Sequence, residues 1–247
     1  MKFKDHFSKQ AREYAKFRPH YPRELFAFIA ANSPNDQLAL DCATGNGQAA
    51  IELAEFFHKV IAIDASAAQI ENASPGERVE YRVAAAEESS LPNESCDAIT
   101  VAQALHWFDL DRFYLETRRV LRPGGILAVW SYKELRATPE IEAVVRHYHD
   151  EVVGQYWPAE RKLVGHVYLE LPFPFAEIEC PEFEAQVRWS YEDLRGYLNT
   201  WSATQRYIAA TARDPRELIN RELAQAWGDG AEERVIAWPL TVRAGRA

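Results

Sequence analysis

Cysteine is scarce in this sequence of 247 residues, and the three cysteines present lie far apart. Cys42, Cys96 and Cys180 form no Cys-x-x-Cys pair, and no histidine accompanies them at the spacing of a metal site. An odd and dispersed set is typical of reduced thiols, not of a disulfide framework or a zinc centre. The sequence therefore predicts a protein with no bound metal.

Long apolar runs are also absent. The first 22 residues contain no apolar stretch of signal-peptide length, and no later segment approaches the roughly 20 apolar residues of a membrane span. Basic residues are outnumbered, because 28 Lys and Arg face 37 Asp and Glu and leave a net charge of −9. This charge opposes non-specific nucleic-acid binding. We expect a cytoplasmic monomer or homodimer that acts on a small molecule, without membrane or nucleic-acid partners.

The chain does have an ample supply of apolar residues, 47% of the total, for a buried core. Short apolar runs predict five strands, and amphipathic or capped segments between them predict helices. Strand and helix alternate, which favours an α/β fold: a Rossmann-like, seven-stranded, mostly parallel sheet with helices on both faces. The predicted strands are residues 38–42, 59–64, 79–84, 98–102 and 126–130, and the helices are residues 48–57, 66–72 and 109–121.

The flanking segments suggest a single domain over residues 1–247 with four parts. A helix over Phe3–Lys16 and a second helix opened by Pro22 predict an N-terminal helical lid. Beyond the fifth strand the alternation fails, which predicts an insertion over the site. The insertion begins with a predicted helix at 138–153. The C-terminal part is predicted to form strands at 183–189 and 234–243, with Pro239 at an edge or bulge, and helices at 191–199 and 215–227. The four parts are 1–34 (lid), 35–131 (cofactor-binding core), 132–182 (cap or insertion) and 183–247 (completion of the sheet).

A glycine turn follows the first predicted strand in "LDCATGNGQAA", residues 40–50. Gly45-x-Gly47-x-x-Ala50 fits the dinucleotide-binding fingerprint, whose third position tolerates alanine. Asp64 closes the second strand, 19 residues beyond Gly45, where an acid in this fold accepts the ribose hydroxyls of a cofactor. Enzymes that use nicotinamide cofactors and enzymes that use S-adenosylmethionine both need such an acid, so these features leave both classes open.

Three features favour S-adenosylmethionine. Asp41 stands at the entrance of the turn, where it repels a pyrophosphate and attracts the ammonium of a methionine group. The segment "AAAEESSLP", residues 84–92, follows the third strand as the lining of an adenine pocket does. No second mononucleotide-binding half follows the fifth strand. The turn therefore indicates a cofactor with a cationic amino-acid tail.

Five segments in order and spacing resemble the class I S-adenosylmethionine-dependent methyltransferases. They are "LDCATGNGQAA", "VIAIDASAAQIENA", "AAAEESSLP", "CDAITVAQALHWFD" and "RRVLRPGGILAVW". The resemblance is to the small-molecule group of methyltransferase type 11, related to ubiquinone-biosynthesis and trans-aconitate methyltransferases. The segments "FSKQAREYAKFRPHYP" and "YLNTWSATQRY" look like the trans-aconitate branch.

The resemblance implies a role for each matching residue. The turn and Gln103 would surround the methionine part, Asp64 would bind the ribose, and the third-strand segment would frame the adenine. Two departures from the family pattern are Cys42-Ala43 in the turn and Ala85, where many relatives carry an acid for the adenine amino group. The expected cofactor contacts are Tyr14, Arg18, Asp41, Ala43, Gly45, Gly47, Asp64, Ala65, Ala86, Glu87 and Gln103.

The acceptor should approach the end of the fourth strand. His106 is the candidate general base, needed only for a neutral acceptor such as a phenol or amine; a packing or capping histidine is the alternative. Trp107, Trp201 and Arg206 are candidates for the acceptor pocket, although aromatic residues at helical spacing also occur in cores. The arginines near the N-terminus, Arg18 among them, favour a carboxylate acceptor.

Three functions remain open from the sequence. The first is methyl transfer from S-adenosylmethionine to a small molecule by in-line displacement. The second is a Rossmann-type NAD(P)-dependent oxidoreductase, which the glycines and Asp64 support but Asp41 and the missing Tyr-x-x-x-Lys arrangement oppose. The third is a non-catalytic module that retains the cofactor pocket, because methyl transfer requires no diagnostic catalytic residue.

Overall fold

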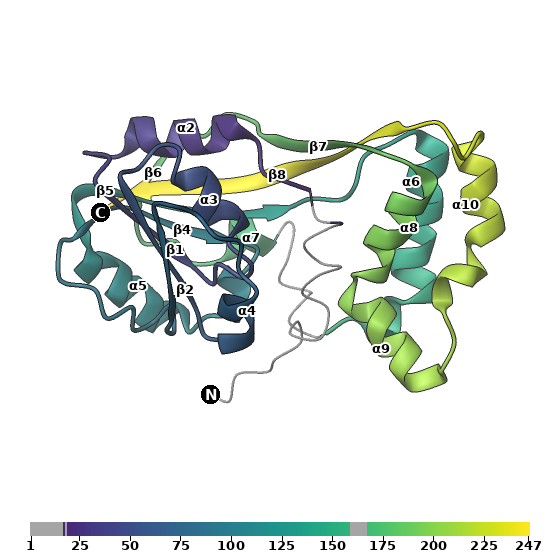
Figure 1. Ribbon diagram of the computed structural model, residues 1–247, viewed down its shortest axis with the longest axis horizontal. Coiled ribbons are helices and arrows are strands. Elements are labelled where there is room, and N and C mark those ends of the chain that lie inside the picture. The colour runs from purple at the N-terminus through teal and green to yellow at the C-terminus, as the bar shows by residue number, and fades with distance from the viewer. Residues whose placement is uncertain (1–16, 18, 159–166) are drawn as a thin grey trace.

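The computed structural model describes residue 17, residues 19–158 and residues 167–247. These residues form a sheet-based core and a helical lobe, which lie beside one another along the long axis of the molecule (Figure 1). The lobe contains α6 (Pro139–His147), α8 (Tyr191–Asn199), α9 (Ser202–Thr211) and α10 (Asn220–Trp227).

Within the described residues, seven strands cross the core in the order β3-β2-β1-β4-β5-β8-β6. The first five are parallel to one another, and β8 runs antiparallel to both of its neighbours, β5 and β6. This confirms the predicted mostly parallel sheet. The strands are β1 (Leu38–Cys42), β2 (Lys59–Asp64), β3 (Val79–Val83), β4 (Cys96–Ala102), β5 (Leu121–Tyr132), β6 (Ala176–Ile178) and β8 (Arg234–Arg246).

Helices cover both faces of this sheet, because successive strand residues point to opposite sides. Ala39 and Val60 join an apolar cluster with α2 (Arg23–Asn32) and α3 (Gln48–Leu53). Leu40 and Ile61, their immediate neighbours, join a second cluster with α5 (Leu110–Val120) and α7 (Val167–Glu170). The continuous apolar runs of the parallel strands are therefore explained by burial on both sides.

The strand β8 connects the core to the lobe. Its residues 240–246 pair with β5, whereas residues 234–239 pair with β7 (Glu184–Trp189). Because β8 is antiparallel to β5 and Leu240 pairs with Tyr132, the first half of β8 extends beyond the carboxyl end of β5. Pro239, predicted at an edge or bulge, lies where β8 changes partner. The lobe therefore stands at the carboxyl edge of the sheet.

A line of aromatic rings joins the two parts. Trp201 contacts Tyr197 at 5.8 Å between centroids, Tyr197 contacts Trp238 at 5.1 Å, and Trp238 contacts Tyr132 at 6.3 Å. Tyr132 in turn stacks on Tyr21 at 5.4 Å. Such pairs contribute about 0.5–1.5 kcal/mol each beyond their buried area. The lobe is thus packed onto the core through a shared apolar cluster.

The strands and helices predicted in the first half of the chain are present, but two differ clearly in their bounds: the helix predicted at 48–57 ends at Leu53, and the strand predicted at 126–130 spans Leu121–Tyr132. The strands at 38–42 and 59–64 and the helix at 191–199 begin and end where expected. The helix expected at 215–227 is divided into a 3₁₀ turn, Pro215–Leu218, and α10. The helix α9 was not predicted. Residues 183–247 therefore do more than complete the sheet, because they also form the lobe helices α8, α9 and α10. Residues 3–16 of the expected lid lie outside the described residues.

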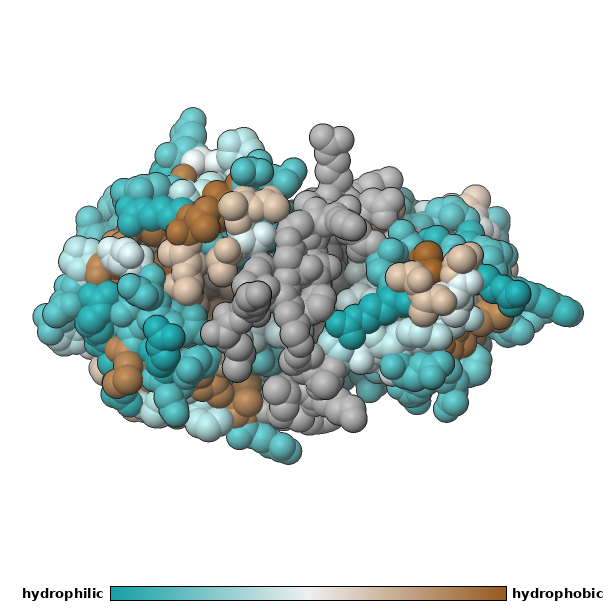
Figure 2. Space-filling view, turned by 90° about the horizontal axis from the view of Figure 1, so that it is seen from below, coloured by the Kyte–Doolittle hydropathy of each residue, from teal (hydrophilic) through white to brown (hydrophobic). Residues whose placement is uncertain are grey.

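The described surface is mostly hydrophilic. Seen from below, apolar residues form separate patches among hydrophilic ones on both parts (Figure 2). None of the helices in the described ranges combines the length and the apolar character that crossing a bilayer requires.

Candidate active site

The turn between β1 and α3 lies at the carboxyl edge of the sheet. Ala43, Gly45 and Gly47 all have positive φ, at 52°, 58° and 89°. A left-handed conformation is unusual for alanine and is found where the structure stabilises a functional loop. A Cβ built on Gly45 would meet no described atom within 4 Å, so the space beside this backbone is available to a ligand.

Gly47 is required for a second, steric reason. A Cβ at this position would lie 2.1 Å from the Tyr81 Oη atom. Tyr81 in turn donates a 2.7 Å hydrogen bond to the Ser74 carbonyl, and the Ser74 N–H donates to the Asn46 carbonyl. The outer side of the turn is therefore supported by the segment between α4 (Ala67–Glu71) and β3.

Asp41 holds the inner side of the turn. Its carboxylate is 1% exposed and accepts hydrogen bonds from the Thr44 hydroxyl at 2.6 Å and the Thr100 hydroxyl at 2.7 Å. Burial raises the pKa of Asp41 to about 6; the two hydroxyl bonds oppose this shift, and the nearby Asp64 adds to it. Neither threonine was predicted as part of the site, although Thr100 is an isolated polar residue in an apolar strand.

Asp64 ends β2 beside the same turn and is 8% exposed. Its Oδ2 atom accepts the Gly45 N–H at 3.0 Å and its Oδ1 atom accepts the Ser66 N–H at 2.8 Å. Ser66 also caps α4, as predicted, by accepting the Gln69 N–H. The carboxylate expected to bind ribose is therefore held next to the glycine turn, and Ala65 beside it is exposed.

The segment after β3 is attached to α5. Ala86 is buried, while Glu87 is partly exposed and accepts the Asp109 N–H at 2.9 Å. Ser89 donates to Glu116 of α5 at 2.6 Å. One Glu87 oxygen is thus occupied by the start of α5, and the adenine contact of Ala86 and Glu87 stays a prediction.

Gln103 follows β4 at the same edge of the sheet, with φ at 60°. Its N–H donates to the Trp130 carbonyl at 2.9 Å. The side-chain nitrogen of Gln103 and the hydroxyl of Ser131 are buried and have no hydrogen-bond partner among the described residues. Buried donors without partners are costly and occur where a ligand completes them.

His106 lies in a short 3₁₀ turn, Leu105–Trp107. Its ring is 4.8 Å from that of Trp107 and 6.1 Å from that of Tyr168. Tyr168 is fully buried, and its hydroxyl accepts the Leu105 N–H at 2.8 Å. Trp107 is 37% exposed. These contacts agree with both earlier interpretations of His106, a packing histidine and a general base.

Trp201 and Arg206 lie in the lobe, whose helices α8 and α9 are drawn nearest to the core (Figure 1). Trp201 is 8% exposed, and its ring packs against Tyr148, Trp157 and His149. It is therefore a core residue of the lobe. Arg206 is partly exposed on α9.

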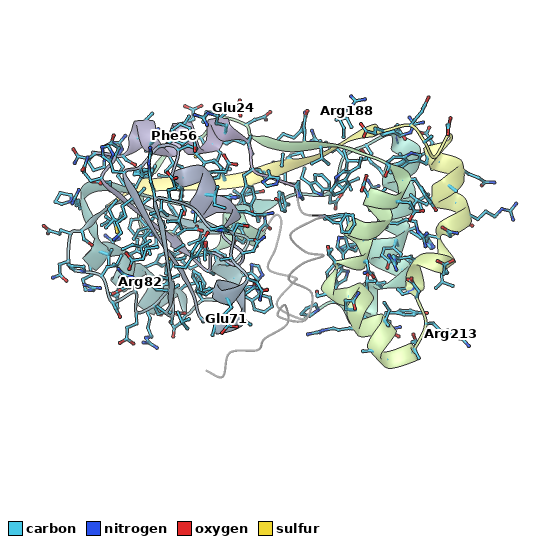
Figure 3. All side chains as sticks on the ribbon, viewed as in Figure 1. Glu24, Phe56, Glu71, Arg82, Arg188 and Arg213 are labelled. Carbon is cyan, nitrogen blue, oxygen red and sulfur yellow. The ribbon has the colours of Figure 1, made fainter. Side chains whose placement is uncertain are left out.

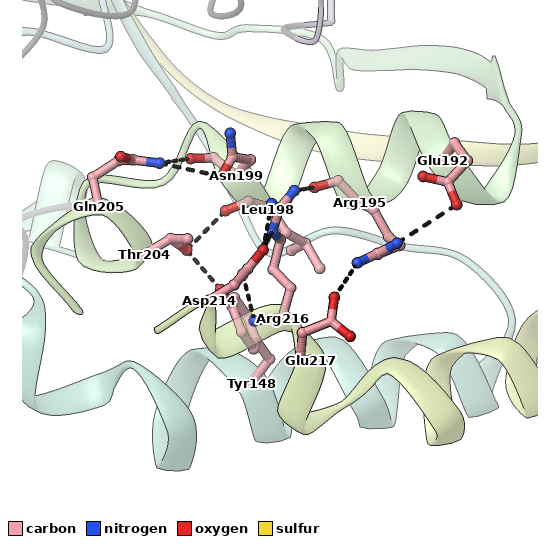
Figure 4. A network of polar contacts seen from close by, with 10 residues as sticks. All are labelled: Tyr148, Glu192, Arg195, Leu198, Asn199, Thr204, Gln205, Asp214, Arg216 and Glu217. Atoms are coloured by element: carbon pink, nitrogen blue, oxygen red, sulfur yellow. Dashed lines mark hydrogen bonds and ion pairs between the residues drawn. The ribbon is translucent and has the colours of Figure 1, made fainter. Parts of the chain in front are cut away.

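A polar network holds α8 and α9 together (Figure 4). The Thr204 hydroxyl donates to the Leu198 carbonyl at 2.8 Å and lies 2.8 Å from the Tyr148 hydroxyl. The Arg216 guanidinium pairs with Asp214 and donates to the Arg195 carbonyl. Thr204 thus attaches the first turn of α9 to the end of α8, and Arg216 attaches the 3₁₀ turn Pro215–Leu218 to α8.

Two expected contacts, Tyr14 and Arg18, lie outside the described residues. The neighbouring Phe17 occupies the space beside Gly196 of α8, where a Cβ would lie 2.5 Å from its ring. The Pro19 carbonyl accepts a hydrogen bond from Tyr132 at 2.7 Å. The chain thus passes from the lobe to the carboxyl edge of β5 before α2 begins.

The donors and acceptors at this edge suit S-adenosylmethionine. The space beside Gly45 fits a ligand that approaches the backbone, Asp41 and Asp64 provide negative charge near it, and Gln103 offers an unpaired donor. Among the described residues, no group of three His, Cys, Asp or Glu side chains is arranged to hold a metal ion.

The sheet order and the antiparallel β8 define a class I methyltransferase fold. A methyltransferase-domain model matches residues 40–129. A predicted methyltransferase of Dictyostelium discoideum is 38% identical over 230 residues, which cover 92% of this chain and 88% of that protein. CRG1 of Saccharomyces cerevisiae, a predicted S-adenosylmethionine-dependent methyltransferase, is 30% identical over 132 residues, 50% of this chain and 45% of CRG1.

A solved structure extends the similarity over nearly the whole fold. The structure of a predicted type II methyltransferase from Anaeromyxobacter dehalogenans has a TM-score of 0.89 and 45% identity, and covers 93% of this chain and 98% of that one. The chain belongs to the S-adenosylmethionine-dependent methyltransferases, within the methyltransferase type 11 domain family. S-adenosylmethionine is the methyl donor of this family, so the oxidoreductase alternative is set aside.

Proposed function

We propose that this methyltransferase acts on a small-molecule acceptor that carries a carboxylate. The observation that supports the acceptor class is Arg206, a partly exposed arginine that makes no hydrogen bond or ion pair with any other described residue. The other buried or partly exposed arginines of the described chain all donate to a carboxylate or a carbonyl. They are Arg82, Arg119, Arg122, Arg195, Arg216, Arg234 and Arg243.

The position of Arg206 separates it from the arginines of the surface. Arg188 and Arg213 are exposed and project away from the molecule (Figure 3), where water solvates them. Arg206 belongs to α9, one of the two lobe helices nearest the core. An available guanidinium favours a carboxylate, which it binds through two parallel hydrogen bonds. The similarity of residues 197–207 to the trans-aconitate branch, whose named substrate is a carboxylic acid, supports the same class.

Methyl transfer to such an acceptor requires alignment more than proton transfer. When bound, S-adenosylmethionine supplies a methyl group on a positively charged sulfur. An acceptor oxygen in line with this bond forms the new O–C bond as the C–S bond breaks and its electron pair passes to sulfur. A carboxylate is already an anion, so His106 is needed as a base only for a neutral acceptor. Alignment by the turn, Gln103 and Arg206 would contribute up to about 7–11 kcal/mol.

The test uses S-adenosylmethionine labelled in its methyl group and a panel of carboxylic acids, phenols and amines. We expect labelled methyl esters and thermal stabilisation by S-adenosylmethionine and its demethylated product, but not by NAD. Methylation of phenols or amines alone would contradict the acceptor class. Cofactor binding without any methylated product would favour the non-catalytic module.

A pair of variants tests the arginine itself. Arg206→Gln is expected to raise the acceptor KM about tenfold and to leave cofactor affinity unchanged. Arg213→Gln removes an exposed arginine from the same lobe and serves as the matched control. Equal acceptor KM values for the two variants would remove Arg206 from the acceptor site.

A further inference from the structure

The buried charge of Asp41 has no cationic partner among the described residues. Two threonine hydroxyls, from Thr44 in the turn and Thr100 on β4, are its hydrogen-bond donors, and no described Lys, Arg or His forms an ion pair with it. A carboxylate removed from water ordinarily needs an opposite charge or several strong donors. Two neutral hydroxyls compensate the buried charge only in part.

The groups that face Asp41 make its charge less favourable still. Asp64, at the end of the neighbouring strand β2, is also acidic and acts on it electrostatically. The Tyr81 hydroxyl on β3 and the Cys42 thiol next in the chain are neutral acids, and the charge of Asp41 contributes to the raised pKa of each. In the part of the chain that the structure describes, the strands and the turn around Asp41 therefore supply no positive charge.

The bound cofactor would supply the positive charge that Asp41 does not receive from the described residues. S-adenosylmethionine carries a sulfonium and an ammonium against one carboxylate, for a net charge of +1, whereas its demethylated product has lost the sulfonium charge. Asp41 precedes the turn whose Gly45 faces open space, so a ligand there would lie against the turn that Asp41 anchors. Its carboxylate is buried beneath this turn and would act through a medium of low polarity, where attraction is stronger than in water.

We propose that Asp41 is a positioning residue whose ionisation is coupled to the charge of the cofactor, so that S-adenosylmethionine binds with release of a proton from Asp41 and is preferred over its demethylated product, which has no net charge. This inference rests on the proposed use of the cofactor, and no chemical step passes through Asp41. Below the pH at which Asp41 ionises, the free protein holds this proton, and binding of the cation displaces it. Above that pH the charge is already present and attracts the sulfonium directly.

Isothermal titration calorimetry in buffers of different ionisation enthalpy measures the proton directly. Burial raises the pKa of Asp41 to about 6, so about half of the sites are protonated at pH 6. We expect release of close to half a proton per S-adenosylmethionine at pH 6, less for the demethylated product, and more at pH 5, where Asp41 of the free protein is mostly protonated. The ligand's own ammonium is fully protonated at pH 6 and does not contribute.

Two variants separate this coupling from a structural role. Asp41→Asn keeps the shape of the side chain and is expected to abolish the proton release and weaken S-adenosylmethionine about tenfold, with a smaller effect on the product. Thr100→Val removes one donor from the carboxylate, which disfavours ionisation further and should move the release to higher pH. A merely structural role would not shift the pH of the release.

The outcomes are distinct. A binding heat at pH 6 that does not depend on the buffer would overturn the coupling. An unchanged proton release in Asp41→Asn would also overturn it, because the proton would then come from another group. Absence of binding heat at every pH would instead contradict the use of the cofactor itself. Retention of the release in Asp97→Asn, which removes a buried aspartate from the opposite edge of the sheet, would support Asp41 as its source.

Discussion

The two edges of the sheet bury an aspartate in opposite ways. At the amino edge, Asp97 at the start of β4 is fully buried and accepts the Gln37 and Leu38 N–H groups at 3.0 Å and the Arg122 guanidinium at 2.8 Å. At the carboxyl edge, Asp41 is buried to the same degree but receives only two hydroxyls. The charge of Asp97 is paired with a guanidinium within the protein, whereas the charge of Asp41 has no cation beside it among the described residues.

Within one sheet, the buried aspartate of the amino edge is arranged for stability and that of the carboxyl edge is arranged in the way expected of a binding site. A buried ion pair with additional backbone donors loses stability when either partner is removed. A buried charge without a cation lowers stability and is retained where binding requires it. The carboxyl edge also contains Ala43 and Gln103 with positive φ and the unpaired donor of Gln103, which is the pattern expected of a site completed by its ligand.

Removal of the cation at the amino edge should have the largest effect. Arg122→Met leaves the Asp97 carboxylate buried without its partner, and we expect the free energy of unfolding to fall by about 3 kcal/mol. Urea denaturation at neutral pH measures this change. The matched control is Arg188→Met, which removes an exposed arginine paired with Glu233 and should change stability little. Equal losses in the two variants would show that Asp97 does not depend on Arg122.

Removal of the Asp41 charge at the carboxyl edge should raise the free energy of unfolding, the opposite of the effect expected for Arg122→Met. The folded-state pKa of Asp41 is raised from 3.8 to about 6, so the ionised group costs up to about 3 kcal/mol of stability above pH 6. Asp41→Asn should therefore unfold at higher urea concentration than the wild type at pH 8.

The pH dependence of that difference follows from the sign of the shift. Between pH 4 and pH 6 the folded protein binds more protons at Asp41 than the unfolded chain does, so the contribution of Asp41 to stability falls as the pH rises through this window. The advantage of Asp41→Asn should accordingly shrink as the pH falls from 8 and disappear below about pH 4. An advantage that is constant with pH would mean that charge is not its cause.

The third prediction concerns cofactor affinity at the carboxyl edge. Asp64→Ala should weaken S-adenosylmethionine binding by about 1.5–3 kcal/mol, because hydrogen bonds between the ribose and a charged acceptor are lost. Calorimetry measures the change, with Asp36→Ala, an exposed aspartate at the amino edge, as the control. Unchanged affinity in a folded Asp64→Ala protein would remove Asp64 from the ribose site.

The smallest expected change in the free energy of unfolding comes from substituting two buried threonines, Thr100 and Thr117. Thr100→Val should lower the free energy of unfolding by about 1–2 kcal/mol at pH 8, because a hydrogen bond to the Asp41 carboxylate is lost. Thr117 on α5 is 1% exposed, and its hydroxyl has no hydrogen-bond partner among the described residues. Thr117→Val should thus be neutral or stabilising. Thermal unfolding of both variants decides whether the hydroxyl of Thr100 supports the charge.

Local sequence signals were sufficient for the core of the fold. The strands β1 and β2 are short apolar runs bounded by polar turns, and Ser66, Asp109 and Thr138 cap helices that each begin one residue later. Five motifs in order led to the cofactor, and the family assignment confirms this. The helix α9 was missed because its ends lack strong signals: Trp201 precedes it without a capping side chain, and Ala212 ends it.

The chain itself determined the alternating sheet, the glycine turn and the acid that ends β2, because each depends on residues close together in the sequence. Only the tertiary structure decided what surrounds them. Thr44 and Thr100 meet on Asp41 although one comes from the turn and the other from β4, 59 residues from the aspartate. Likewise, the half of β8 beyond β5 places the lobe at the carboxyl edge. Contacts of this kind depend on the register of strands and on burial, which no local pattern of residues encodes.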